Sequence, residues 1–217
     1  MRIGTLVSSF VLLCVMVACK KGDKDVASER PPAESGSRNG LLSTDSVSPF
    51  KMPEKYAAAF AEYRSGWTRL TGYEFSGLHW GQFISLYVNK DPDTYIRNYR
   101  EYVRLYVDAD IDGSSHAEAG HFEPYAVGTI FLKENYRADS GMRSTPLTVT
   151  AMIKREAGYD PATHDWEFVQ FDTTGRILFG GNSRDAATGV MCIKCHGSIS
   201  ERDLIFSTFY SNAPSGK

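Results

Sequence analysis

Two cysteines and a histidine near the end of the sequence have the spacing of a covalent cofactor site. Cys192, Cys195 and His196 form a Cys-x-x-Cys-His run. Two thiols at this spacing can each form a thioether with one vinyl group of a porphyrin, and the adjacent imidazole can then coordinate the iron. The alternative is a redox or zinc Cys-x-x-Cys pair followed by an unrelated histidine. The complete run predicts one covalently bound haem c, with His196 as the proximal iron ligand.

The N-terminal residues predict export and lipidation. Residues 1–18 begin with the basic Arg2 and continue with a mostly apolar run, shorter than the about 20 apolar residues that span a membrane. The run ends in Val-Met-Val-Ala before Cys19, which resembles a bacterial lipobox. We therefore expect a lipoprotein signal peptide over 1–18 and a lipid on Cys19 that anchors a periplasm-facing chain in the cell envelope. Lys20 favours the outer membrane, and an ordinary signal for a soluble periplasmic protein is the alternative.

Cysteine use and charge limit the classes of function further. Cys14 lies in the signal, Cys19 takes the lipid and the two remaining cysteines take the haem, so none is left for a disulfide. Loss of Arg2 with the signal leaves 23 of the 24 basic residues against 26 acidic ones, a formal charge of −3. Because basic residues are not in excess, nucleic acid is not an expected partner.

Composition divides the mature chain into a tether and one domain. Residues 19–51 are rich in Lys, Ser, Gly, Pro and acidic residues and contain few apolar ones. This composition predicts a flexible tether between the lipid and the folded part of the chain. Residues 52–217 are long enough for one haem domain with a substantial core.

Periodicity within this domain predicts helices first and strands later. Aromatic and aliphatic side chains recur every three or four positions in 54–64 and 91–106, which is typical of amphipathic helices. Asp91 is expected to cap the second helix, with Pro92 at its first position. Strands are predicted over 126–133, 147–154, 166–171 and 176–179. We therefore expect an α+β, mainly β fold: an antiparallel sheet that carries two or more packed helices and forms one wall of the haem pocket.

Other polar residues have incomplete metal-binding patterns. Residues 108–113 open like a calcium loop, but Ala119 occupies the twelfth position, where an acidic residue is required, so we interpret the segment as a polar loop. His116 and His121 could join the two cysteines in a zinc site, but their order and separation are atypical, which favours solvated histidines. Side chains that could take the second axial position of a haem are Met142, Met152, His79, His116, His121 and His164. Spacing alone does not choose among them.

Six runs, in consistent order, carry a family resemblance. They lie at 87–89 (Tyr-Val-Asn), 128–134 (Gly-Thr-Ile-Phe-Leu-Lys-Glu), 151–155, 165–168, 192–196 and 202–206 (Arg-Asp-Leu-Ile-Phe). Together they resemble the cytochrome P460 family over roughly residues 54–210. The resemblance implies a mainly β monohaem protein, often a homodimer. The best-studied members oxidise hydroxylamine to nitrogen oxides, and related proteins of the same fold bind nitric oxide or other gases.

The resemblance also implies a role for one lysine. In the catalytic members a lysine is covalently joined to the porphyrin edge, and its place in the motif corresponds to Lys133. Alternation along a strand would put Phe131 and Thr129 on the face of Lys133, and Glu134 on the opposite face. A strand-end lysine whose ammonium reaches solvent is the alternative. Candidates for the family's distal proton acceptor are Glu123, Glu156 and Glu167.

Three functions remain open on these grounds. The first is a lipid-anchored monohaem c-type cytochrome that oxidises hydroxylamine and passes electrons to an external redox partner, with an open sixth position on the iron. The second is a non-enzymatic haem protein that binds nitric oxide or a similar gas. The third is an electron-transfer cytochrome with a Met or His as its sixth ligand.

Overall fold

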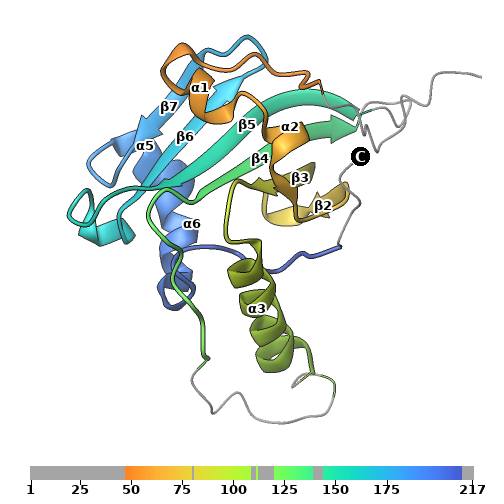
Figure 1. The fold of residues 1–217 in the computed structure, drawn as a ribbon, viewed down its shortest axis with the longest axis vertical. Coiled ribbons are helices and arrows are strands. Elements are labelled where there is room, and N and C mark those ends of the chain that lie inside the picture. The colour runs from red at the N-terminus through yellow and green to blue at the C-terminus, as the bar shows by residue number, and fades with distance from the viewer. Residues whose placement is uncertain (1–46, 80, 109–110, 112–119, 139–143, 212–217) are drawn as a thin grey trace, which may run out of the picture. The chain divides into compact units, whose positions relative to one another are not determined.

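The computed structural model describes residues 47–79, 81–108, 111, 120–138 and 144–211. Within these ranges seven strands form one antiparallel sheet in the order β1-β3-β4-β5-β6-β7, with β2 also paired to β3 (Figure 1). The strands are β1 (Thr68–Arg69), β2 (Glu74–Ser76), β3 (Gln82–Val88), β4 (Ile130–Ala138), β5 (Ser144–Lys154), β6 (Trp166–Asp172) and β7 (Ile177–Gly181). The predicted fold class, α+β and mainly β with an antiparallel sheet, is confirmed.

The helical segments of the described residues are mostly short. Those before the last strands are η1 (Glu54–Tyr56), α1 (Ala57–Phe60), α2 (Tyr63–Gly66), η2 (Gly77–His79), α3 (Pro92–Tyr102), the π-helical η3 (Val103–Asp108) and η4 (Pro161–Thr163). Those after the sheet are α5 (Ala186–Thr188), the π-helical η5 (Gly189–Ile193), α6 (Lys194–His196) and η6 (Gly197–Arg202). No helix in the described part of the chain is long and apolar enough to cross a membrane.

Two details of the predicted helices are wrong. The helix predicted over 54–64 is interrupted, because Glu62 leaves helical geometry with φ −120° and ψ 30° between α1 and α2. Asp91 precedes α3 but does not cap it with its side chain, since its own backbone is left-handed (φ 54°, ψ 43°). Its carboxylate instead accepts a hydrogen bond of 3.4 Å from Thr129 Oγ1. Pro92 does occupy the start of the helix, as predicted.

The predicted strands are present with shifted bounds. The strand predicted over 126–133 begins only at Ile130, because a turn at 127–128, with Gly128 at φ 82°, precedes it. It then continues to Ala138, five residues beyond the predicted end. β3 was not predicted, although it lies between β1 and β4 and pairs with β4 from Phe83 to Val88. The predicted signal peptide and most of the tether, Cys19 included, lie outside the described residues.

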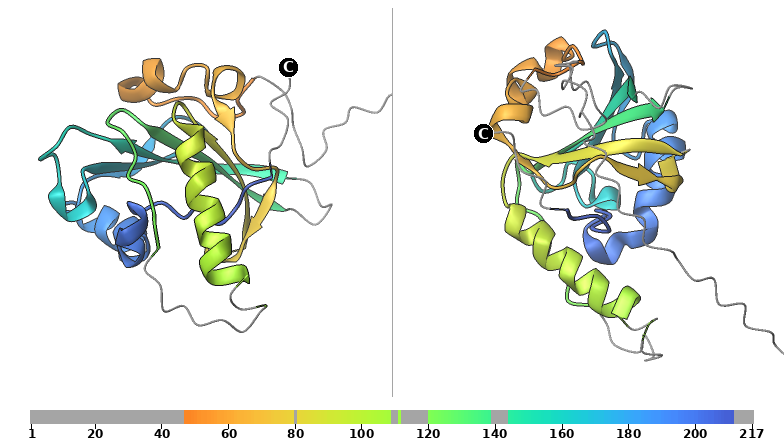
Figure 2. Two further views of the ribbon diagram at one scale, coloured as in Figure 1. Left: turned by 60° about the horizontal axis from the view of Figure 1, so that its bottom comes forward. Right: turned by 90° about the vertical axis from the view of Figure 1, so that its right-hand side faces the viewer.

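The sheet is buried on both faces. Side chains alternate along β4 to β6, so that Leu132, Val149 and Val169 pack with Phe60 and Tyr63 of the N-terminal helices. On the other face the apolar cluster contains Phe131, Met152, Phe168, Tyr95 of α3 and Leu204. Figure 2 shows α1 and α2 on one side of the sheet and α3 and α6 on the other. Helices therefore pack on the sheet as predicted, in two separate layers.

Candidate functional site

The face of the sheet that carries α3 and α6 also holds an apolar cavity. The cavity has about 650 Å³ of empty space, part of it in an open mouth. Its lining residues are His79, Ile84, Leu86, Phe131, Lys133, Thr150, Met152, Phe168, Cys192, His196, Ile205, Phe206 and Phe209. β3 to β6 form one wall and the C-terminal segment forms the other. The sheet thus supplies one wall of the cavity that holds Cys192 and His196.

A helical segment positions the Cys-x-x-Cys-His run. It begins at Asp185, whose carboxylate accepts a 2.7 Å hydrogen bond from the backbone N–H of Thr188. The helix continues through η5 into α6 and carries both cysteines as free thiols. Cys192 is buried against the cavity, where burial raises its thiol pKa to about 11, whereas Cys195 is exposed.

The imidazole of His196 is held in one orientation. Its Nδ1 lies 2.7 Å from the carbonyl oxygen of Leu204. A carbonyl oxygen only accepts, so Nδ1 carries the proton and Nε2 keeps the lone pair that a metal needs. The rings of Phe168 and Phe206 lie edge-on to the imidazole, with centroids 5.7 and 5.1 Å away. Burial lowers the pKa of His196 to about 4, so the ring is neutral at neutral pH.

Lys133 lies in the sheet wall of the same cavity. Its pKa is lowered to about 7, because burial disfavours the charged ammonium. Phe131 lines the cavity beside it, and Glu134 points to the other face of β4, where Arg64 Nε donates to its carboxylate at 2.7 Å. These positions confirm the predicted alternation of the strand. Thr129 lies before β4 and outside the lining.

Two of the candidate sixth ligands line the cavity. His79 lies in η2 with its Nδ1 2.7 Å from Ser76 Oγ, and Met152 lies in β5. Burial lowers the pKa of His79 to about 3. His121 is exposed, and His164 pairs with Asp203 outside the lining. Met142 and His116 lie outside the described residues.

Comparison with known families identifies the domain. Residues 82–207, more than half of the 217 residues, match the family model of cytochrome P460. The chain belongs to the cytochrome P460 family. Haem binding follows from this membership. Neither a search of curated proteins nor a search of solved structures found a match.

The cavity of this cytochrome P460 domain fits a haem. Its lining is dominated by aromatic and aliphatic side chains, which suit a porphyrin face. His196 directs a free Nε2 lone pair from the wall that also carries the Cys192 thiol. A haem bound there would supply an iron able to bind small ligands and to exchange electrons.

None of the candidate distal acids lines the cytochrome P460 cavity. Glu123 pairs with Arg97 at the surface and Glu156 is exposed. Glu167 is buried on the opposite face of the sheet, where Tyr56 and Arg155 donate to its carboxylate. Among the described residues the lining contains no carboxylate. The basic side chains in this lining are His79, Lys133 and His196.

The alternative metal sites find no support in the described ranges. The segment 108–113 and its continuation lie mostly outside them, as does His116. No group of three or more His, Cys, Asp or Glu side chains in the described part of the chain is arranged to hold a metal ion.

The sequence did not point to several groups of this P460 site. Leu204 contributes only a backbone carbonyl, which no side-chain pattern reveals. Phe206 and Phe209 line the cavity on the C-terminal wall, and Ser76 contacts His79 from β2. The sequence did offer one signal for this segment. The motif at 202–206 belongs to the family pattern and follows shortly after the Cys-x-x-Cys-His run.

Proposed function

We propose that this cytochrome P460 protein is a monohaem c-type cytochrome that oxidises hydroxylamine to nitrogen oxides. Cys192 and Cys195 form the two thioethers, and Nε2 of His196 is the proximal ligand. The observation that supports catalysis is the position of Lys133, whose amine lines the same cavity as His196 and Cys192. Catalytic members of the family join the corresponding lysine to the porphyrin edge.

The cavity residues have defined tasks in this proposal. A haem iron supplies ligand binding and electron transfer. The aromatic lining offers water few hydrogen-bond partners, and His196 holds its orientation through the Leu204 carbonyl. Oxidation of hydroxylamine releases protons together with electrons. His79 is the basic side chain of the described lining that neither ligates the iron nor joins the porphyrin. Burial lowers its pKa to about 3, so at neutral pH it can pass protons on but does not hold them.

Hydroxylamine turnover tests the activity. Purified holoprotein is mixed with hydroxylamine and an artificial electron acceptor, and reduction of the acceptor is followed by absorbance. We expect turnover by the wild type and its loss in Lys133→Met, while Lys51→Met, at an exposed lysine, behaves as the wild type. Absence of acceptor reduction by the wild type would refute hydroxylamine oxidation.

The mass of the haem peptide tests the bond to Lys133 separately. Formation of a bond between the lysine nitrogen and a porphyrin carbon removes one hydrogen from each partner. It is thus a two-electron oxidation that requires an external oxidant such as a peroxide, which takes up the two hydrogens as it is reduced to water. After proteolysis the cross-link therefore joins the peptide that contains Lys133 to the haem peptide of Cys192 and Cys195, and the mass is the sum of the two less two hydrogens. The reduced Soret band of the cross-linked protein is strongly red-shifted. The mass of the thioether-only peptide in the wild type would exclude the cross-link.

Gas binding without turnover is the second candidate function. The absence of a carboxylate from the described lining favours it, because an apolar pocket stabilises neutral diatomic ligands without a proton acceptor. This function predicts that the ferrous protein binds nitric oxide and that hydroxylamine is not oxidised. A low-spin spectrum in both oxidation states would instead indicate an electron carrier with His79 or Met152 as sixth ligand.

Location and assembly complete the proposal. A lipid on Cys19 anchors the domain to the outer membrane with its haem facing the periplasm, where an external redox partner takes the electrons. Cys19→Ala is expected to move the protein from the membrane fraction to the soluble periplasmic fraction.

The homodimer that the family resemblance implies is tested by sedimentation of the purified domain, and a monomer at micromolar concentration would contradict it.

A further inference from the structure

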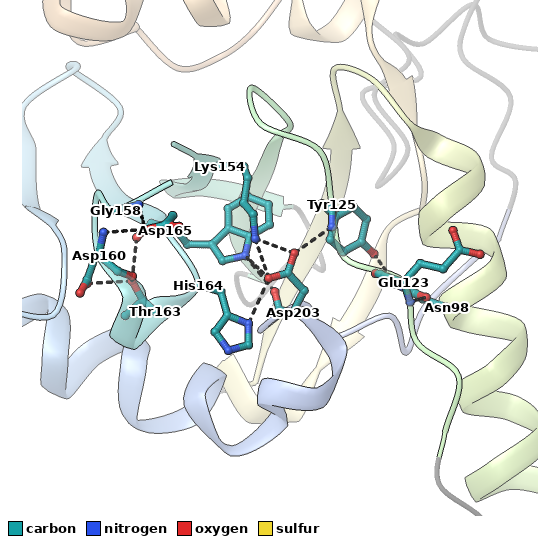
Figure 3. Close-up of polar contacts among 11 residues, drawn as sticks. Asn98, Glu123, Tyr125, Lys154, Gly158, Asp160, Thr163, His164, Asp165 and Asp203 are labelled. Atoms are coloured by element: carbon teal, nitrogen blue, oxygen red, sulfur yellow. Dashed lines mark hydrogen bonds and ion pairs between the residues drawn. The ribbon is translucent and has the colours of Figure 1, made fainter. Parts of the chain in front are cut away.

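Asp203 is a buried carboxylate with an unusually complete set of donors (Figure 3). Lys154 Nζ donates to both of its oxygens, at 2.7 and 2.8 Å. The backbone N–H of Tyr125 donates to Oδ2 at 2.8 Å, and Trp166 Nε1 lies 3.2 Å from Oδ1. His164 Nδ1 also lies 3.2 Å from Oδ1. Donors from β5, β6 and two loops therefore converge on one side chain.

The backbone at Asp203 has a conformation that needs such support. Asp203 and Leu204 are consecutive and both left-handed, with φ 51° and 63°. Neither is glycine, and left-handed backbone is particularly unfavourable for a large side chain such as that of Leu204. Trp166 Nε1 adds a 2.9 Å hydrogen bond to the backbone carbonyl of Asp203. Surrounding contacts therefore have to hold this turn in place.

The turn determines where the carbonyl of Leu204 points. That carbonyl is the acceptor, at 2.7 Å, for Nδ1 of His196. The bond fixes which imidazole nitrogen carries the proton, and it raises the basicity of Nε2, the nitrogen that would coordinate a haem iron. A turn that relaxed to right-handed or extended backbone would move the carbonyl away from the imidazole.

We propose that Asp203 is a positioning residue for the proximal histidine. Its carboxylate holds the left-handed turn, the turn presents the Leu204 carbonyl, and the carbonyl tunes His196. The proposal rests on ligation of the haem by His196, as in the proposed function. Charge-assisted bonds suit this task because they are stronger than neutral ones, and the Lys154 partner is itself only 11% exposed. The Lys154 ammonium also lies 4.9 Å from the centre of the Trp166 ring, which fixes the cation.

Two substitutions of Asp203 test the proposal in the holoprotein. Asp203→Ala removes every hydrogen bond to the carboxylate and disfavours the left-handed backbone. Asp203→Asn keeps an acceptor and tolerates that backbone, but it removes the charge that binds Lys154. The readouts are the iron–histidine stretching vibration of the ferrous protein and the midpoint potential of the haem. Neither depends on turnover, and a merely structural role would change stability without moving them.

We expect a weaker bond at His196 Nδ1 in both variants. A less basic imidazole lowers the iron–histidine frequency and raises the midpoint potential, since it stabilises ferric iron less. The shifts should be larger in Asp203→Ala than in Asp203→Asn. Asp172→Asn is the matched control, because Asp172 organises another turn by accepting from Thr174 N at 2.9 Å and Arg176 Nε at 3.0 Å, and it lies outside the cavity lining. Its spectra and potential should equal those of the wild type.

The outcomes separate this proposal from the proposed function. Wild-type frequency and potential in both Asp203 variants would overturn the positioning role while leaving hydroxylamine oxidation intact. If Asp203→Ala yields no folded holoprotein, the result for Asp203→Asn decides alone, with the same criterion. Spectra that show no histidine ligation in the wild type would refute the proposed haem site and this role together.

Discussion

Glu134 provides a test of how the sheet behind the haem cavity is held together. Its side chain is 1% exposed and accepts from Arg64 Nε at 2.7 Å, and the Arg64 side chain is 4% exposed. Glu123 makes the same kind of pair with Arg97 at 2.7 Å, but those side chains are 47% and 50% exposed. We predict that Glu134→Gln destabilises the domain far more than Glu123→Gln does.

The expected magnitudes follow from burial. Removing one partner of a buried ion pair costs about 3–5 kcal/mol, because the other charge stays in a medium that solvates it poorly. Arg64 keeps acceptors in Val47 O at 2.9 Å and Tyr136 Oη at 2.7 Å, so we expect the lower end, about 3 kcal/mol. An exposed pair contributes about 0.2–1 kcal/mol. A domain of this size loses about 2–4 °C of melting temperature per kcal/mol, so Glu134→Gln should melt about 6–12 °C lower.

The assay is urea and thermal unfolding of the holoprotein, followed by far-ultraviolet circular dichroism and by Soret absorbance. The double variant Arg64→Met/Glu134→Leu serves as a second control. It removes both buried charges, so most of the lost stability should return. A loss for Glu134→Gln no larger than that for Glu123→Gln would refute the reasoning, because burial would then not decide the strength of the pair.

Three further predictions concern pH, attachment of the haem and the sixth axial position. Burial opposes ionisation of Glu167, but hydrogen bonds from Tyr56, Arg155 and Lys55 outweigh it and hold its pKa below the ordinary 4.5. The stability that this carboxylate provides is therefore present above pH 4.5 and lost as pH falls through the lower folded pKa, and Glu167→Gln should flatten the acid limb of an unfolding-versus-pH curve. Cys192→Ser and Cys195→Ser should each retain haem through one thioether, and the double variant should release it into acidified acetone. His79→Ala should leave the ferric haem spectrum high-spin, and a change from low-spin to high-spin would identify His79 as the sixth ligand instead.

The local pattern of apolar and polar residues in the sequence predicts much of the fold. β4 to β6 were predictable because β-branched and aromatic residues alternate there between two buried faces. β3 was harder to predict, although it carries Phe83, Ile84, Leu86, Tyr87 and Val88. It starts with a polar residue, and few turn-forming residues separate it from the short strands β1 and β2. The break at Glu62 was not predictable, since alanine and glutamate favour helix and the interruption serves tertiary contacts of Tyr63.

The site was predictable where chemistry depends on side-chain type. Cys192 and His196 were named from their spacing and Lys133 from the family resemblance, and the structure places all three on one cavity. The support of His196 was not predictable, because it consists of a backbone carbonyl in a left-handed turn. Such turns are normally signalled by glycine or asparagine, whereas here Asp203 and Leu204 adopt them.

Neighbouring charges on β4 constrain how the sheet can assemble. Lys133 lies opposite Thr150 on β5 and faces the cavity, and Glu134 lies opposite Val149 and faces Arg64. A slip of one residue would turn every β4 side chain over. It would place a carboxylate in the aromatic cavity and a lysine beside the Arg64 guanidinium, and both placements are unfavourable. We therefore expect these two residues to favour the native register of β4 over a slip of one residue.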